Sequence, residues 1–297
     1  MFGLRRSKPA VQTPAAPDGK SSHWIDGPSE MAKAAMQYFG TPDRSQEMLL
    51  AAVNDILPLT SVADFGTGRG SWLKAAMEIG VQDVRGYDIP EIPLEERQFP
   101  PECFFAADLG QPVDVGRQFS LSISTEVAEH LPKEHAATFV ANVASASDIV
   151  LFSAAIPYQG GAGHCNENWV EYWAKLFAAQ GFACFDFLRM RFWNEAAIRS
   201  YYRQNVMIFA KGNAAETLRG HGHAPTPNAP SLVHPEQYLK SVGRALPPEM
   251  ARVGADVHHY YDCVTKAPEV VDADPDRRVY GQEGVGIGAI RKHLGKP

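Results

Sequence analysis

The sequence lacks several features that mark common classes of protein. It contains no run of about 18 apolar residues, so no membrane span is predicted. It has no excess of positive charge either, because its net charge is −6, which disfavours a general nucleic-acid binder. Only four cysteines occur in 297 residues, and none forms a CxxC pair. The start MFGLRRSKPAVQ has no apolar segment after its basic pair. We therefore expect a cytoplasmic protein with reduced thiols and no secretory signal.

What is present is a regular alternation of short apolar runs and helical patterns. Strands are predicted at 61–65, 83–88, 103–108, 119–124, 148–155, 183–188 and 205–211, and helices between them at 71–80, 133–144 and 168–181. Such alternation is typical of an α/β fold. We predict a doubly wound, Rossmann-like sheet of seven strands, mostly parallel, in which the last two runs pair antiparallel at an edge. N-terminal helices and a C-terminal extension complete the predicted fold.

Composition divides the chain into four parts. Residues 1–22 are rich in Pro, Ala, Ser and Lys and predict a disordered tail. The main domain is predicted at 23–212, and its first helical patterns lie at 29–39 and 44–57. The Gly, Pro and His content of 213–232 predicts a loop or linker. Residues 233–297 form the predicted C-terminal extension, with a short helix near 235–245.

Glycines and carboxylates follow the first three predicted strands. The turn 66-GTGRG-70 comes directly before a helix, where glycines allow a nucleotide cofactor to approach the backbone. The third glycine arrives one residue too early for the dinucleotide fingerprint GxGxxG. Asp64, Asp88 and Asp108 accompany the three strand ends in order. A single glycine turn is often structural, and a single Asp is often a helix cap, but all three features in order indicate a cofactor site.

A second group of polar residues follows the fourth predicted strand, in 125-TEVAEHLP-132. Glu126, Glu129 and His130 fall on one face if this segment turns helically. His164 lies in the Gly-rich loop after the next strand, and both loops are expected at the carboxyl edge of the sheet. Two carboxylates and two imidazoles suit Mg²⁺, Mn²⁺, Fe²⁺ or Zn²⁺. Direct acid–base or substrate contact by Glu126, His130 or His164 is a second interpretation, and a structural role is the third.

These motifs resemble those of the class I S-adenosylmethionine-dependent methyltransferases. VADFGTGRG looks like the first motif of that family, GYDIPE like its acidic second-strand motif and AADL like its adenine-side motif, over about 45–212. The resemblance implies a methyltransferase domain with S-adenosylmethionine as its cofactor. It also implies that Asp64, Gly66 and Gly68 line the methionine part, that Asp88 contacts the ribose and that Asp108 contacts the adenine.

The pattern ExxEH followed by a later histidine resembles metal-dependent O-methyltransferases, among them the small-RNA 3′-end 2′-O-methyltransferases. That likeness implies a divalent metal, such as Mg²⁺ or Mn²⁺, held by Glu126, Glu129, His130 and His164. The run SAAIPYQGGAGHCNENWVEYWAKLF resembles methyltransferase-domain proteins of bacterial surface-glycan and polysaccharide pathways. It implies methylation of a hydroxyl on a sugar or glycan, free or linked to a nucleotide or lipid. Tyr158 and Trp169 are candidates for a stacking wall, with core packing as the default.

Other functions stay open at this point. An RNA or a phenol or catechol is an alternative acceptor, although the pI near 5.9 does not favour RNA. An NAD-type oxidoreductase is disfavoured by the glycine spacing and the missing Tyr/Lys signature. A non-catalytic scaffold would not need Asp88, Asp108 and the Glu/His set. The C-terminal extension is a candidate for self-association.

Overall fold

The structure is a computed structural model that describes residues 44–245, apart from the side chains of 242–245. The predicted tail at 1–22, the helical pattern at 29–39 and the part of the C-terminal extension after residue 245 lie outside the described residues. Among the described residues, no helix combines the length and the apolar character needed to cross a membrane.

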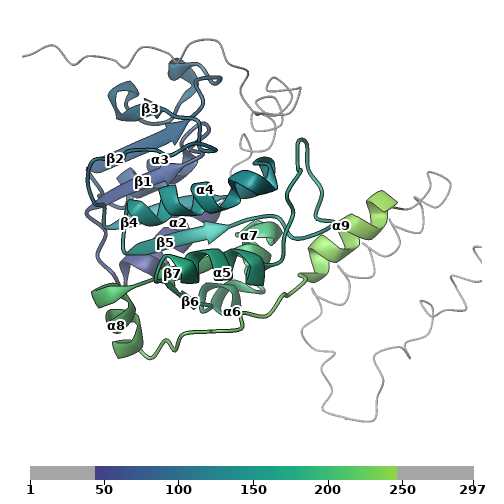
Figure 1. The fold of residues 1–297 in the computed structure, drawn as a ribbon. Coiled ribbons are helices and arrows are strands. Elements are labelled where there is room, and N and C mark those ends of the chain that lie inside the picture. Colours follow the sequence, from purple (N-terminus) through teal and green to yellow (C-terminus); the bar gives the residue numbers. More distant parts are fainter. Residues whose placement is uncertain (1–43, 246–297) are drawn as a thin grey trace, which may run out of the picture.

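A seven-stranded sheet runs through the centre of the described chain (Figure 1), in the order β3-β2-β1-β4-β5-β7-β6. Strand β7 is antiparallel to both β5 and β6, and the other pairs are parallel. The predicted doubly wound, mostly parallel sheet with antiparallel pairing at one edge is confirmed. The strands are β1 (Ser61–Phe65), β2 (Asp83–Asp88), β3 (Phe104–Ala106), β4 (Leu121–Thr125), β5 (Ile149–Ser153), β6 (Ala183–Phe185) and β7 (Met207–Ala210).

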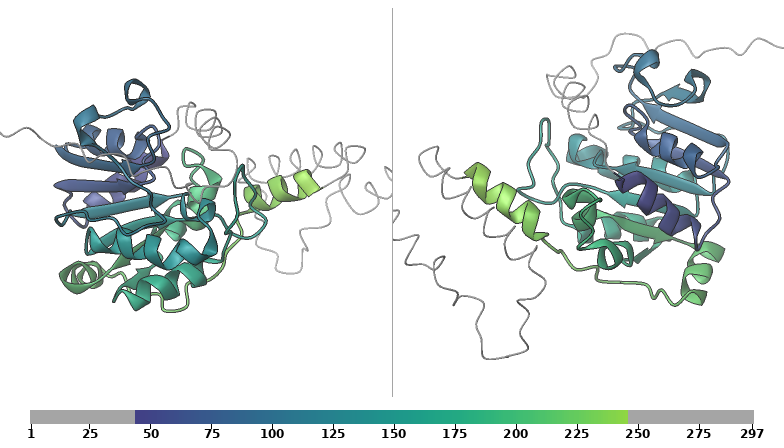
Figure 2. Two further views of the ribbon diagram at one scale, coloured as in Figure 1. Left: turned by 45° about the horizontal axis from the view of Figure 1, so that its top comes forward. Right: turned by 180° about the vertical axis from the view of Figure 1, so that it is seen from behind.

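Helices cover both faces of the sheet, as Figure 1 and the view from behind in Figure 2 show. One apolar cluster joins the sheet to α2 (Ser45–Asn54), α3 (Ser71–Glu78), α6 (Leu188–Phe192) and α7 (Ser200–Asn205). A second cluster joins the other face to α4 (Ala136–Ser145) and α5 (Val170–Ala179). Short 3-10 turns lie in the connections: η1 (Leu94–Glu96), η2 (Pro101–Cys103), η3 (Ala128–His130) and η4 (Lys133–His135).

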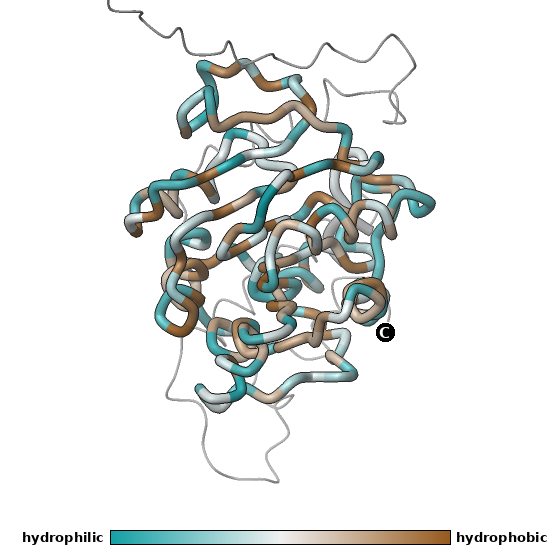
Figure 3. The backbone as a smooth tube through the Cα atoms, turned by 60° about the vertical axis from the view of Figure 1, so that its left-hand side comes forward, coloured by the Kyte–Doolittle hydropathy of each residue, from teal (hydrophilic) through white to brown (hydrophobic). Residues whose placement is uncertain are grey.

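The central strands are buried because both of their faces are covered. Every residue of β4 and β5 is buried, which is the pattern of parallel strands between two helix layers. Figure 3 shows hydrophobic stretches along the strands and hydrophilic residues concentrated in the connections. Thr125 pairs with Ser153 at the ends of β4 and β5, so the chain leaves both strands at the same edge.

The segment predicted as a loop or linker contains a helix. Helix α8 spans Gly212–Gly220, and its Ala215 and Leu218 enter one of the apolar clusters. No apolar periodicity marks this helix in the sequence, because only two of its side chains are buried. The chain then passes β6, where the Thr226 N–H donates to the Cys184 carbonyl at 2.8 Å. The last described element is α9 (Pro235–Ala245), the short helix predicted near 235–245.

Candidate functional site

The glycine turn after β1 combines a packing requirement with open space. Gly66 and Gly68 both have positive φ, +81° and +52°. A Cβ on Gly66 would overlap the Cγ atoms of Val127, whereas a Cβ on Gly68 would meet no atom within 4 Å. Gly66 therefore allows the turn to pack on the segment after β4. Gly68 leaves room at the position where the sequence predicts a cofactor.

Two predicted cofactor carboxylates are hydrogen-bonded to the backbone. Asp88 accepts from the Gly68 N–H at 2.7 Å and from the Ile89 N–H at 2.8 Å. Asp108 accepts from the Gly110 N–H at 2.9 Å. A carboxylate oxygen has more than one acceptor site, so both groups retain capacity for a ligand. The structure thus gives Asp88 and Asp108 a backbone role that is compatible with the ligand role predicted for them.

Asp64 differs from Asp88 and Asp108, because one of its buried carboxylate oxygens accepts no hydrogen bond from the described residues. The residue is 2% exposed, and Oδ2 has no hydrogen-bond partner among the described residues. Burial raises the pKa of Asp64 to about 7, and the charge of Asp88 adds to the rise. A cation bound nearby would remove this penalty. An ammonium such as that of a methionine moiety fits the site.

Arg97 connects the loops that follow β1 and β2, and the sequence analysis did not single it out. Its guanidinium donates to the Gly68 carbonyl at 2.7 Å and to the Ile89 carbonyl at 3.4 Å. It lies 3.7 Å from the centroid of the Phe104 ring, and its charge opposes the rise that burial causes in the pKa of Asp88. No motif marks Arg97, because its role depends on a loop that returns 29 residues after Gly68.

The segment after β4 turns sharply instead of continuing as one helix. Glu126 has a φ of +53°, and the single turn η3 begins only at Ala128. The Glu126 carboxylate accepts from Gln159 Nε2 at 2.7 Å and from Asn205 Nδ2 at 3.1 Å. Burial raises the pKa of Glu126, and the Asn205 and Gln159 amides oppose the rise. Glu126 is therefore bound to protein side chains on both oxygens.

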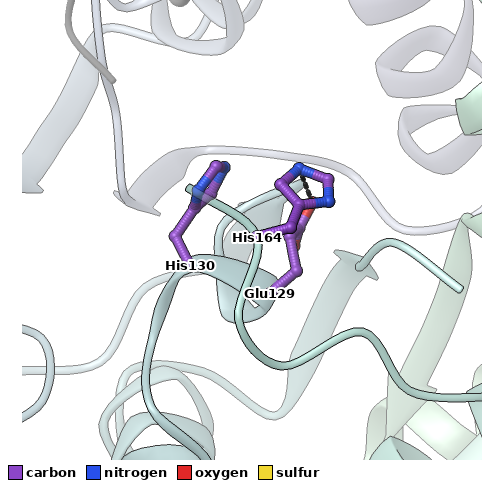
Figure 4. Close-up of side chains that lie close together, drawn as sticks. All are labelled: Glu129, His130 and His164. Atoms are coloured by element: carbon purple, nitrogen blue, oxygen red, sulfur yellow. Dashed lines mark ion pairs between the residues drawn. The ribbon is translucent and has the colours of Figure 1, made fainter. Parts of the chain in front are cut away.

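Glu129, His130 and His164 come together at the carboxyl edge (Figure 4). One donor atom from each residue lies within 4.8 Å of the others. Glu129 is fully buried, and neither of its oxygens has a hydrogen-bond partner among the described residues. His130 Nδ1 is likewise buried without such a partner. The imidazoles meet edge to face, with ring centroids 4.8 Å apart.

The electrostatics of this Glu/His group, defined as Glu129, His130 and His164, favour a bound cation. Burial raises the pKa of Glu129 well above its usual value, and the charge of Glu126 raises it further. Burial lowers the pKa of His130 to about 4, with a smaller contribution from His164. A neutral imidazole and a desolvated carboxylate are ligands for a divalent ion. The chemistry of the donor set therefore fits the predicted metal.

Backbone hydrogen bonds bring His164 to the group from the β5–α5 loop. The N–H groups of Cys165 and Asn166 both donate to the Glu129 carbonyl, at 2.9 and 3.0 Å. His164 Nε2 then lies 4.0 Å from Glu129 Oε1, while Nδ1 lies 2.8 Å from Glu167 Oε1. Glu167 is a residue that the sequence reasoning did not assign, although the spacing of 164-HCNE-167 carries a signal for it.

The predicted site residues thus fall into two neighbouring groups. The first group lies at the ends of β1, β2 and β3: Asp64 and Asp88 are within β1 and β2, whereas Gly66, Gly68 and Asp108 follow β1 and β3. The Glu/His group follows β4 and β5. Three of the four residues predicted as metal ligands, Glu129, His130 and His164, converge. The fourth, Glu126, is not part of this group, and the side-chain amides of Gln159 and Asn205 bind its carboxylate.

No protein-family model matches the chain, and no curated protein matches it. Similar solved structures exist. The methyltransferase domain of bacterial CtHen1 is 17% identical, with 56% of this chain and 98% of that chain covered at a TM-score of 0.42. CalS10, an amino pentose methyltransferase from Micromonospora echinaspora with SAM bound, is 12% identical, with 61% and 97% covered at a TM-score of 0.47.

An O-methyltransferase family protein from Burkholderia thailandensis is 12% identical, with 62% of this chain and 59% of that chain covered at a TM-score of 0.43. All three structures belong to methyltransferases or to an O-methyltransferase family. At these identities and TM-scores, the likeness carries no argument about activity. That argument has to come from the residues of the site.

Proposed function

We propose that the chain is an S-adenosylmethionine-dependent O-methyltransferase that methylates a hydroxyl of a sugar or glycan. In this proposal the cofactor lies beside the glycine turn, and a divalent metal such as Mg²⁺ or Mn²⁺ is held by Glu129, His130 and His164.

The observation that carries the proposal is the contact between the two groups of site residues. Gly66 of the glycine turn packs directly against Val127, where a Cβ would not fit. Val127 is flanked by Glu126 and lies two residues before Glu129. In this proposal a ligand beside the open position at Gly68 lies near Glu129 and His130, whose carboxylate oxygens and Nδ1 are buried without a hydrogen-bond partner among the described residues. This arrangement supports a methyl donor and an activated acceptor at one edge of the sheet.

Each group of residues has a separate task in the proposal. Asp88 and Asp108 accept hydrogen bonds from the cofactor, while the Asp64 carboxylate faces its ammonium. S-adenosylmethionine supplies an activated methyl group, and a divalent ion lowers the pKa of a hydroxyl that it binds. The burial of Glu129 keeps water away from the donors, which strengthens their interaction with a cation.

His130 is a poor proton acceptor in this site, since its pKa of about 4 makes it a weak base at neutral pH. Its neutral imidazole therefore supports the metal interpretation over direct acid–base catalysis by this residue. Glu126 supports the site differently, because its two amide partners hold the turn between β4 and the Glu/His group.

The choice of a sugar acceptor rests on the sequence resemblance, on the net charge of −6 and on exposed aromatic rings near His164. Tyr158 is 88% exposed, and Trp169 is 40% exposed. Both flank the loop that carries His164. Aromatic rings presented in this way suit the apolar face of a sugar ring, whereas a long RNA strand would require a basic surface.

Calorimetric titration of the full chain with S-adenosylmethionine tests the cofactor part of the proposal. Wild type should bind, Asp88→Ala should bind at least about tenfold more weakly because a ligand hydrogen bond to a charged group is lost, and the exposed Asp114→Ala should bind like wild type. Absence of cofactor binding would overturn the proposal.

A methyl-transfer assay with a sugar acceptor tests the metal part. Activity should require Mn²⁺ or Mg²⁺, and full activity in EDTA would overturn the metal part alone.

A further inference from the structure

One carboxylate, that of Glu167, holds three separate groups of the β5–α5 loop. Its Oε1 lies 2.8 Å from His164 Nδ1 and accepts from the Gly160 N–H at 2.6 Å. Its Oε2 accepts from the Tyr158 N–H at 2.8 Å. The Glu167 side chain is 18% exposed; its hydrogen bond to His164 is partly buried, whereas those to the Tyr158 and Gly160 N–H groups are exposed. A single side chain thereby fixes the course of the loop that brings His164 to Glu129.

The hydrogen bond to His164 determines which ring nitrogen carries the proton. A carboxylate accepts and does not donate, so in the neutral imidazole the hydrogen has to lie on Nδ1. Nε2 is then left with a lone pair, on the side of the ring that faces Glu129 Oε1 at 4.0 Å. Gly161 lies against the same ring, where a Cβ would overlap the imidazole. The ring is therefore held in orientation from two sides.

The second oxygen of Glu167 holds a strained residue. Tyr158 has a φ of +66° although it is not glycine, and such strain persists only where neighbouring groups impose it. Its N–H is bound by Glu167, and its carbonyl accepts from the Ser241 hydroxyl of α9 at 2.9 Å. The Tyr158 ring makes little packing contact, being 88% exposed. The backbone of the loop is therefore what these contacts stabilise.

We propose that Glu167 is the positioning residue of the Glu/His group: it fixes His164 as the Nδ1–H tautomer, with Nε2 turned to Glu129 and His130, and holds the 158–164 loop in place. The tautomer follows from this chain alone. Its value as a ligand rests on the proposed function, because an outer carboxylate orients a histidine that binds a metal.

The first test is independent of metal and cofactor. Nitrogen NMR of the metal-free protein, recorded at a pH where His164 is neutral, reports which ring nitrogen is protonated. Wild type should show the Nδ1–H tautomer, and Glu167→Gln should retain it, because the amide oxygen still accepts from Nδ1–H. Glu167→Ala should show a mixture of both tautomers. The matched control is Glu171→Ala, which removes an exposed carboxylate from α5 and should leave the signal of His164 unchanged.

Two outcomes of this test would overturn the inference: an Nε2–H tautomer in wild type, or an unchanged Nδ1–H signal in Glu167→Ala. If Glu167→Ala does not fold, wild type still decides the tautomer. Glu167→Gln then separates the two oxygens, since its NH2 group cannot accept from the Tyr158 N–H. The amide signal of Tyr158 should shift in Glu167→Gln while the tautomer of His164 stays.

The second test measures the effect on metal binding, with Mn²⁺ alone as the probe in calorimetric titration. Glu167→Ala should bind Mn²⁺ about 10–100-fold more weakly than wild type, as is usual when an outer ligand partner is removed. Glu167→Gln should recover most of this loss, and Glu171→Ala should bind like wild type. Equal affinity in Glu167→Ala and wild type would overturn the positioning role. If wild type binds no Mn²⁺ while the tautomer results hold, the metal part of the proposed function fails and the tautomer assignment stands.

Discussion

The two halves of the carboxyl edge differ in how the protein hydrogen-bonds their buried polar groups. In the glycine-turn half, after β1 to β3, Asp88 and Asp108 are held by backbone N–H groups. In the histidine half, after β4 and β5, Glu129 and His130 Nδ1 are buried with no hydrogen-bond partner among the described residues. In the first half Asp88 and Asp108 are thus bound by the protein itself, and Asp64 Oδ2 is the buried carboxylate oxygen that has no partner among the described residues. The second half carries an electrostatic cost that a bound cation would remove.

Backbone strain is also greater in the histidine half. Positive φ values in the glycine turn fall on glycines, which adopt them without steric cost. The two non-glycine residues with positive φ in the described chain, Glu126 and Tyr158, both lie in the histidine half. Strained residues of this kind concentrate at functional sites. We therefore expect substitutions in the two halves to have opposite effects on stability.

The largest effect is expected at Glu129, where Glu129→Gln should weaken Mn²⁺ binding at least about 100-fold, because the anionic ligand is lost. The metal-free variant should also be more stable than wild type at pH 8. Folding raises the pKa of Glu129 above 4.5, so wild-type stability falls as the pH rises from the unfolded to the folded pKa. The variant lacks this decline. Thermal melts from pH 5 to 8 in EDTA measure it, with exposed Glu134→Gln as control.

The next effect concerns the packing between the halves. Gly66→Ala should destabilise the fold by about 2–5 kcal/mol, since it adds left-handed strain and a clash with Val127. Gly80→Ala is the matched control, because Gly80 also has positive φ, +100°, but open space around it. Gly80→Ala should lower the free energy of unfolding only by the left-handed backbone strain, about 1–2 kcal/mol. Urea unfolding compares the two, and equal losses would show that the contact with Val127 is not tight.

A third test addresses the unsatisfied carboxylate in the glycine-turn half. The pKa of Asp64 is raised to about 7, and a cationic cofactor group prefers the ionised form. Affinity for S-adenosylmethionine should therefore fall by about tenfold per pH unit below pH 7 and stay level just above it. Asp64→Asn should remove this dependence, while Asp114→Asn should keep it. Calorimetric titration from pH 5.5 to 8 is decisive: a constant affinity in wild type would contradict an ionic role for Asp64.

The glycine-turn half was the more predictable part of the molecule. Strands β1 and β2 have the predicted bounds, Ser61–Phe65 and Asp83–Asp88, because local apolar patterns and turn residues determine them. The carboxylates at the strand ends are contiguous with these patterns, so their place at the carboxyl edge followed from the topology alone.

The histidine half was predicted only in part, because its geometry depends on contacts between distant residues. A helical turn from Glu126 was the expectation, but Asn205 holds the Glu126 carboxylate from 79 residues away. The 3-10 turn that follows brings Glu129 and His130 together with His164. Neither the partner Asn205 nor the role of Glu167 is visible in a local pattern. Side-chain hydrogen bonds across the fold therefore limit prediction here.

The smallest effect is expected at Tyr158, and it reverses the result for Gly66. Tyr158→Gly removes left-handed strain of about 1–2 kcal/mol, while the greater freedom of glycine in the unfolded chain offsets about 0.4–1 kcal/mol. A net gain of at most about 1.5 kcal/mol in urea unfolding is therefore expected, since the ring is 88% exposed and packs little. The KM for a sugar acceptor should rise about threefold to tenfold through the loss of ring contacts. Tyr158→Phe should match wild type in both measurements. A loss of stability in Tyr158→Gly would mean that the ring, and not the backbone held by Glu167, keeps the loop in place.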